Sequence, residues 1–164
     1  MAIYVIKGEL LEPGDPDWPF GPKPDVCFEP LTGGVWWSAN AFDSMKHPGR
    51  DGFCGPKTVT GWPDSTDTEC IAILAGVVEK CRWYENGLWV RIRHNVDLIS
   101  LSGHLNGPDV HDGDVVEAGQ RLSTIWGGVH PPHLHNQIKV RVGGKWMWVD
   151  PAAWYKAQGA QVWE

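Results

Sequence analysis

The chain lacks a hydrophobic run long enough to span a membrane, and it lacks any cluster of basic residues. Its 164 residues contain 14 Lys and Arg against 20 Asp and Glu, which gives a formal net charge of −6. A membrane-spanning helix needs roughly 18–20 consecutive apolar residues, and binding to nucleic-acid phosphates needs a basic face. We therefore expect neither a membrane span nor a nucleic-acid partner.

The N-terminus lacks the features of a secretory signal peptide. Residues 1–16 read MAIYVIKGELLEPGDP, a short apolar run that is interrupted by Lys7 and Glu9. A signal peptide has a basic start and a longer apolar centre. The sequence thus indicates either export by another route or a signal that has been trimmed away.

Two common zinc motifs are missing. Cys27, Cys54, Cys70 and Cys81 show no CxxC spacing, which disfavours a structural zinc knuckle. No HExxH is present, which excludes the helical zinc site of many proteases. The four cysteines could form two disulfides in three connectivities or remain thiols. We expect buried thiols, because a chain of this length can build a stable core without disulfide bonds.

What the sequence has in abundance is Gly (20), Pro (13) and Trp (11). Many turns between short segments favour an all-β fold, and Asp150-Pro151 is a good start for a short helix. We predict a mainly β, antiparallel domain with two packed sheets or a partly closed barrel, and a C-terminal helix. The predicted strands are 71–78, 88–94, 98–101, parts of 115–126, 134–142 and 145–149, and the predicted helix is 151–158.

The chain has the size of one domain, which we expect to occupy residues 33–164. Residues 1–32, rich in Pro and Gly from residue 11 onward, are expected to form an extended lead-in packed on that body. Among the tryptophans, Trp36 and Trp37 are adjacent, and Trp146 and Trp148 alternate along the sequence. Some of these four side chains must therefore face outward, where an indole ring could stack on a sugar. We expect most of the tryptophans to fill the core instead.

The spacing of the seven histidines is the most informative feature. His133 and His135 flank Leu134 and would share one face of a strand. His47 and Asp51 are separated by Pro and Gly, which predicts a loop that can bring both to one ion. A catalytic zinc ion takes three N or O protein ligands and an open position. His47, Asp51 and one histidine of the HxH pair provide that set. The other histidine of the pair and His104, at a strand end, could then transfer protons.

In chain order these residues resemble the motifs of the lysostaphin-like M23 metallopeptidases, over roughly residues 33–152. The matching segments are HPGRD at 47–51, GLWVRIRH at 87–94, SGHL at 102–105, VHDGDVVEAGQ at 110–120, HLH at 133–135 and VDP at 149–151. These six motifs stand in the correct order, which makes coincidence improbable. The chain departs from the usual sequence pattern of this family in four places, which bear on the specificity and shape of the groove. They are the short loop 127–132, Asn136-Gln137 after HLH, Ser102 before the catalytic histidine, and the longer segment 51–71.

The resemblance implies a zinc-dependent peptidase that cleaves peptide bonds in bacterial peptidoglycan with a groove across one sheet. It implies His47, Asp51 and His135 as Zn²⁺ ligands and His104 and His133 as the catalytic pair. Trp126, His130 and Asn40 are candidates for the groove. Such a protein would act outside the cell at the wall, as a secreted, phage-lysin-like or virion-associated enzyme. The sequence leaves the oligomeric state open.

Two other functions compete with hydrolysis. An inactive relative could bind peptidoglycan or a protein partner, but such relatives lose one or more of the five residues, and this chain keeps them all. The segment VHDGDVVEAGQRL at 110–122 also resembles lipoyl and biotinyl carrier domains. Those domains need a lysine at a hairpin tip, and Lys46 lies directly beside His47 instead. His111 and His130 are expected at the surface, and His94 either near the site or bonded to backbone.

Overall fold

The computed structural model describes residues 4–6, 9–11, 29–32, 35–38, 42–43, 45–54, 61 and 64–158. The groove candidate Asn40 and Cys27 lie outside this range. The described elements are β1 (Tyr4–Ile6), β2 (Glu9–Leu11), β3 (Val35–Trp37), β4 (Arg50–Cys54), β5 (Glu69–Ile71), β6 (Gly76–Tyr84), β7 (Gly87–Asn95), β8 (Leu98–Leu105), β9 (Val115–Val116), β10 (Arg121–Thr124), β11 (Leu134–Val142), β12 (Lys145–Val149) and α1 (Pro151–Ala157).

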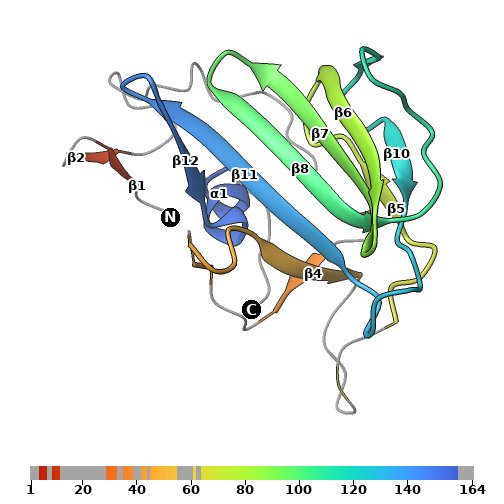
Figure 1. Ribbon diagram of the computed structural model, residues 1–164. Coiled ribbons are helices and arrows are strands. Elements are labelled where there is room, and N and C mark those ends of the chain that lie inside the picture. Colours follow the sequence, from red (N-terminus) through yellow and green to blue (C-terminus); the bar gives the residue numbers. More distant parts are fainter. Residues whose placement is uncertain are drawn as a thin grey trace.

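Eight of these strands form one large sheet in the order β3-β4-β11-β8-β7-β6-β9, with β12 also paired to β11 (Figure 1). Every strand pair in it is antiparallel. β5 pairs with β10, and β1 pairs with β2, in two small sheets. The predicted mainly β, antiparallel fold is confirmed, and the sheets stay open and do not close into a barrel.

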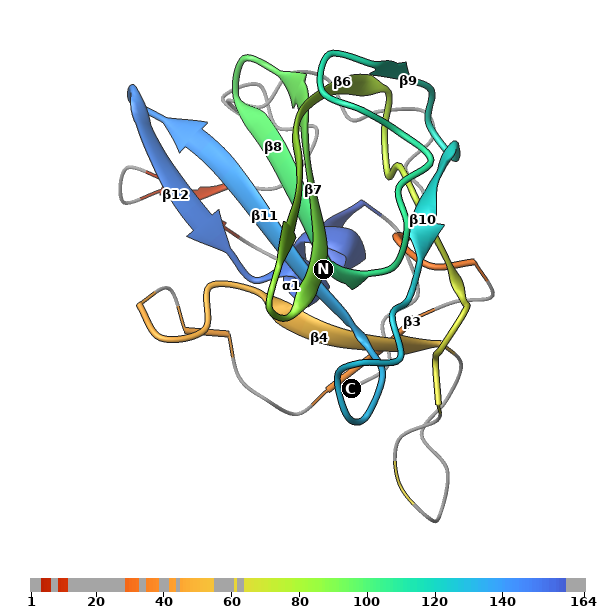
Figure 2. The same cartoon turned by 45° about the vertical axis from the view of Figure 1, so that its right-hand side comes forward.

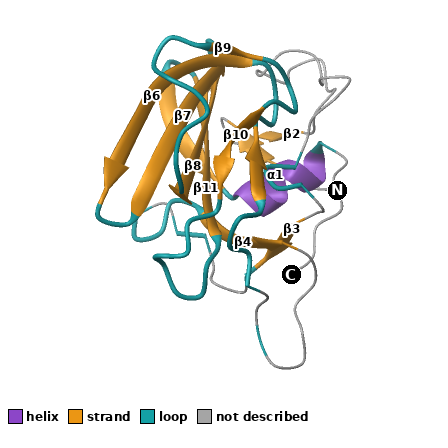
Figure 3. Cartoon of the chain, turned by 90° about the vertical axis from the view of Figure 1, so that its right-hand side faces the viewer, coloured by secondary structure: helices purple, strands orange, loops and turns teal. Residues whose placement is uncertain are grey.

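The large sheet has one covered and one open face, and the sequence of β7 shows why. Leu88, Val90 and Ile92 are buried, whereas Trp89 and Arg91 between them are only partly buried. Alternate residues of a strand point to opposite faces. The apolar set packs on the side where α1 and β10 lie, and no described helix or strand lies over the other side (Figure 3).

Helix α1 forms where the sequence predicts it and is tied to the covered face. Asp150 caps it by accepting the Ala152 N–H at 3.0 Å. Tyr155 stacks on Trp37 with ring centroids 5.4 Å apart, and its hydroxyl donates to Asn136 Oδ1 at 3.0 Å. Asn136 also donates to Leu101 O on β8 at 2.9 Å. This buried amide of β11, directly after HLH, therefore links the helix to two strands.

Two strand predictions need correction, and the simpler one is the strand 98–101, which continues to Leu105 as β8. The predicted strand 71–78 is two strands, because the chain leaves β5 at Ile71 and enters β6 only at Gly76. β6 then continues to Tyr84 through residues whose side chains are mostly exposed. β3 and β4 were not predicted, since two glycines precede β3 and Pro and Gly flank β4 on both sides.

The described cysteines Cys54, Cys70 and Cys81 are free thiols, as predicted, although only Cys70 is fully buried. Burial raises the pKa of the Cys70 thiol to about 12. Cys70 therefore behaves as a core residue rather than as a nucleophile.

The expectation that most tryptophans fill the core is wrong for the described residues. Trp37 and Trp154 are buried, but Trp83 is 53% exposed. Trp146 and Trp148 lie on the open face of β12, where Lys139 stands 4.9 Å from the ring centroid of Trp148. Long cationic side chains cover these rings in place of a second apolar layer.

None of the described helices has the length and hydrophobicity of a membrane span. The proposed division at residue 32 stays a prediction. Near it, Leu31 is buried and forms a bridge with Cys70, so the chain joins the body at this point.

Candidate metal centre and active site

The predicted site residues meet where β11 begins. At this end β11 pairs with β4 on one side and with β8 on the other. His135 lies opposite Asp51 of β4 and opposite Gly103 of β8, and Figures 1 and 2 show β4 beside the beginning of β11. Because Asn136 faces α1, its neighbour His135 faces the open side of the sheet.

Three imidazole nitrogens converge on one carboxylate oxygen. Asp51 Oδ1 is 3.5 Å from His47 Nε2, 3.4 Å from His133 Nε2 and 3.2 Å from His135 Nδ1. Within this cluster, His47, Asp51 and His135 each offer one ligand atom, all within 4.8 Å of one another. These are the three residues that the family resemblance implied as ligands.

The segment from His47 to Asp51 is only partly the loop that its Pro and Gly predict. His47 ends a turn in which it forms a backbone bridge with Asp43. The Asp43 carboxylate shapes that turn by accepting the N–H groups of Met45 and Lys46. Asp51 is already the second residue of β4. A strand therefore holds Asp51 in place, and a tight turn brings His47 to it.

The donor set fits a zinc ion. Three ring nitrogens facing one carboxylate oxygen require protons or a cation between them, since lone pairs alone would repel. Two imidazoles and one carboxylate are common ligands of catalytic zinc. His47 Nδ1 is buried and has no hydrogen-bond partner among the described residues, so only its Nε2 is engaged. The described residues therefore satisfy the chemistry of such a centre.

The two remaining histidines are each oriented by a backbone carbonyl. His133 Nδ1 lies 2.6 Å from Pro131 O, and His104 Nδ1 lies 2.8 Å from Asn86 O. A carbonyl only accepts, so each Nδ1 carries the proton. The His104 Nε2 is then left to accept or return a proton, whereas the His133 Nε2 also faces Asp51 Oδ1 at 3.4 Å. The centroids of the two rings are 4.9 Å apart.

Burial and charge act differently on the ionisable groups of the cluster. Burial lowers the pKa of His104, and the nearby histidines lower it further. Burial also lowers the pKa of His133, but hydrogen bonds to Asp51 and Pro131 outweigh it and raise the pKa overall. Burial would raise the pKa of Asp51, yet hydrogen bonds from His133 and His135 hold it well below its usual range. Asp51 is thus fully ionised.

His104 reaches the cluster through a β-bulge. Between Leu88 and Val90 on β7, the partner strand β8 contains one extra residue, and His104 has a φ of 60°. Left-handed backbone is costly for residues with a Cβ, and bulges often redirect a side chain beside a functional site. The bulge therefore costs folding stability, and it places the His104 imidazole at the cluster.

A comparison of two variants measures this cost. His104→Gly is expected to be about 1 kcal/mol more stable than His104→Ala, because glycine adopts positive φ without a steric penalty. Both variants lack the imidazole, so its contacts cancel in the comparison. Urea unfolding followed by fluorescence gives the two free energies, and equal values would show that the backbone at His104 is unstrained.

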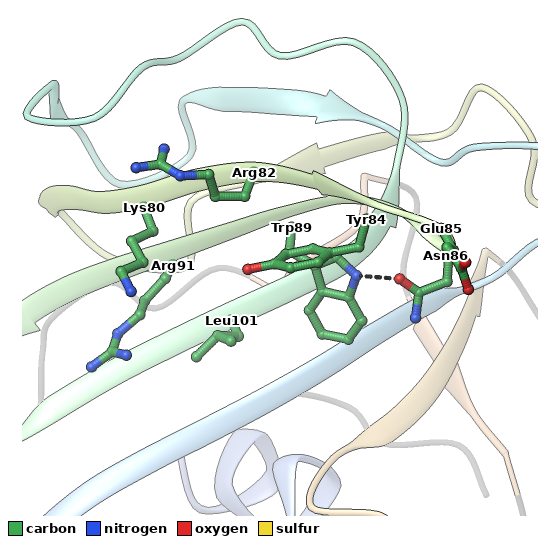
Figure 4. A pocket seen from close by; sticks show the side chains of 8 residues that line it. All are labelled: Lys80, Arg82, Tyr84, Glu85, Asn86, Trp89, Arg91 and Leu101. Carbon is green, nitrogen blue, oxygen red and sulfur yellow. Dashed lines mark hydrogen bonds between the residues drawn. The ribbon is translucent and has the colours of Figure 1, made fainter.

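A pocket of about 640 Å³ adjoins the cluster on the open face (Figure 4). Trp89 lines it and also contacts His104 and His135, with centroid distances of 5.5 and 5.2 Å. Asn86 lines it as well, and its side chain accepts the Trp89 indole N–H at 2.9 Å. Neither residue is among the site residues predicted from the sequence. Asn86 acts on His104 through a backbone carbonyl, which no side-chain pattern reveals.

The other candidates lie beside the cluster or away from it. Trp126 donates its backbone N–H to His104 O at 2.9 Å, while its ring packs edge-on against Trp83. His130 is exposed, as is His111. His94 bonds to Ala75 O and to Ser100 Oγ, at 2.9 and 2.7 Å. Of its two predicted roles, the backbone-bonded one is therefore found.

The fold is similar to the folds of several solved structures. The catalytic domain of the antimicrobial peptidase lysostaphin from Staphylococcus simulans is 25% identical, with a TM-score of 0.53, over 67% of this chain and 79% of that one. A protein from Ruminococcus gnavus named as a glycyl-glycine endopeptidase, LytM, is 21% identical, with a TM-score of 0.59, over 85% and 63%. A protein from Pseudomonas aeruginosa named as a peptidase M23 is 24% identical, with a TM-score of 0.56, over 80% and 51%.

The chain thus spans about half the length of the Pseudomonas protein. No protein with a curated description matches it. The sequence profile of peptidase family M23 matches residues 60–151, more than half of the chain. This segment contains His104, His133 and His135, and Asp51 reaches it through the pairing of β4 with β11. The chain therefore belongs to peptidase family M23.

Proposed function

We propose that the protein is a zinc-dependent endopeptidase that hydrolyses peptide bonds in bacterial peptidoglycan, in a cross-bridge or a stem peptide. The observation that carries the proposal is the convergence of His47, Asp51 and His135 beside His104 and His133, in a member of a peptidase family. Inactive relatives would lose part of this set, and here all five residues face one space.

The five residues divide into ligands and proton carriers. His47 Nε2, Asp51 Oδ1 and His135 Nδ1 would hold the ion. When bound, zinc acts as a Lewis acid, which lowers the pKa of water and polarises a carbonyl group. In both His104 and His133 a backbone carbonyl holds a proton on Nδ1, so that Nε2 faces the cluster, and the His133 Nε2 there lies 3.4 Å from Asp51 Oδ1. One can accept a proton from the attacking water, and the other can donate to the developing oxyanion or the leaving amine.

The substrate class rests on the family resemblance. The similar solved structures include the antimicrobial peptidase lysostaphin and a protein named as a glycyl-glycine endopeptidase. Both names describe peptide cleavage, and the first describes action against microbes. We accordingly propose that this protein acts outside the cell, at the bacterial wall.

Metal analysis combined with a wall-clearing assay tests this function. The purified protein is expected to contain about one zinc ion per chain and to clear a suspension of purified peptidoglycan. A chelator should stop clearing, and added zinc should restore it. Zinc without clearing of walls from several bacterial classes would contradict the proposed substrate. Failure to bind zinc after reconstitution would contradict the metallopeptidase proposal itself.

A further inference from the structure

The pocket beside the histidine cluster has unequal ends. Figure 4 shows the charged groups of Lys80 and Arg91 at one end, Glu85 and Asn86 at the other, and aromatic rings between them. The aromatic residues are Tyr84 and Trp89, and Leu101 lies on the floor. The end away from the histidines is therefore cationic, in a chain whose net charge is −6.

The positive charge at that end is not fully neutralised. Lys80 is exposed and forms no ion pair with a described residue. Glu79 pairs with Arg91 at 2.8 Å, but it also pairs with Arg93. One carboxylate against two guanidinium groups leaves one positive charge uncompensated. By contrast, Arg82 is matched by its own partner, Asp112, at 2.8 Å.

The pocket and the histidine cluster form one continuous surface. Trp89 contacts His104 and His135 and also lines the pocket. Arg91 follows Trp89 by two residues on the same face of β7, about 7 Å further along the strand. Lys80 lies directly opposite Arg91 in the register of β6 and β7. A peptide that reaches from the cluster over Trp89 would meet this cation pair.

We propose that the pocket binds a carboxylate of the peptide substrate, held by Lys80 and Arg91, with the intervening residues packed on Trp89 and Tyr84. The proposal rests on the proposed function and narrows its substrate to carboxylate-bearing peptides rather than neutral ones. At about 3.3 Å per extended residue, the carboxylate lies roughly three or four residues from the reacting carbonyl. Both an acidic side chain and a free C-terminus carry the required group.

Amidation of the wall provides a matched substrate pair. Purified peptidoglycan is compared with the same material after carbodiimide-coupled amidation of its carboxylates. The wild-type protein is expected to clear the native wall about fivefold faster. Lys80→Gln/Arg91→Gln should bring this ratio close to one. Lys145→Gln/Lys156→Gln removes the same charge elsewhere on the surface and should keep the wild-type ratio.

Three fluorophore-labelled peptides distinguish the two sources of the carboxylate. They are tetraglycyl-glutamine amide, tetraglycyl-glutamate amide and tetraglycyl-glutamine with a free C-terminus, titrated on the zinc-loaded protein. Tighter binding of the second identifies an acidic side chain, and tighter binding of the third identifies a chain end. Either preference should weaken at high salt and vanish in Lys80→Gln/Arg91→Gln.

The possible failures are separable. If both walls are cleared equally and all peptides bind equally, the carboxylate inference is wrong while the hydrolase function stands. If the preference persists in Lys80→Gln/Arg91→Gln, another surface recognises the carboxylate and the inference is again wrong. If no wall is cleared but carboxylate peptides bind more tightly through this pair, the pocket assignment holds and the proposed hydrolysis is contradicted.

Discussion

Replacing His133 with alanine is expected to reduce peptidoglycan hydrolysis by roughly 10²–10⁴-fold while zinc stays bound. The ring points its Nε2 into the cluster, 3.4 Å from Asp51 Oδ1, and none of the three proposed ligands is removed. His104→Ala should have the same effect for the same reason. His47→Ala and His135→Ala should lose the metal as well as the activity, because each removes a ligand. Elemental analysis and initial clearing rates measure the two properties on the same samples.

His111→Ala is the matched control, since it removes an exposed imidazole that lies on a turn away from the cluster. It should keep both zinc and activity. Because His104 and His133 act as a unit, the double variant should be little worse than either single one. Retained turnover in His133→Ala would overturn its role, and zinc loss in that variant would make it a ligand.

Gly49→Ala is expected to weaken zinc binding by at least roughly tenfold and to destabilise the protein by about 1–3 kcal/mol. A Cβ at this position would lie 2.4 Å from Asn136 O and 2.7 Å from His135 Nε2. The backbone of β11 cannot yield without moving His135, and the turn cannot yield without moving His47. Competition with a zinc-binding dye and thermal unfolding measure the two effects.

Gly107→Ala is the corresponding control, because an added Cβ there meets no atom within 4 Å. Wild-type zinc affinity in Gly49→Ala would mean that the turn adapts without cost. A loss of stability without a loss of zinc affinity would show that Gly49 serves packing alone and does not position the ligands.

The sequence reveals those parts of the fold and the site that follow from local patterns. HLH predicts two imidazoles near one point because strand geometry is regular, and His133 and His135 indeed both approach Asp51. Alternation and the Gly143-Gly144 turn likewise identify β11 and β12, and Asp150-Pro151 identifies α1.

Features that depend on long-range pairing could not be predicted in this way. The bulge that redirects His104 arises from a mismatch between β7 and β8. The extension of β6 through Arg82 and Trp83 depends on its neighbour, since both side chains are exposed. The half-buried Trp146 and Trp148 contradict the core expectation because the pairing of β12 with β11 turns both rings to the open face of the sheet, and composition alone does not reveal that orientation.

The pairing of β4 with β11 spans only three residue pairs, with His135 and Asp51 in the middle. These two residues are 84 positions apart in the chain. An ion bound by both His135 and Asp51 would act as a cross-link between β11 and β4, where β3 and β4 join the rest of the sheet. The centre would then have a mechanical role besides its chemical one. Losing the metal would loosen the outer strands and expose them to proteases, so that an enzyme stripped of its ion would also become a short-lived one.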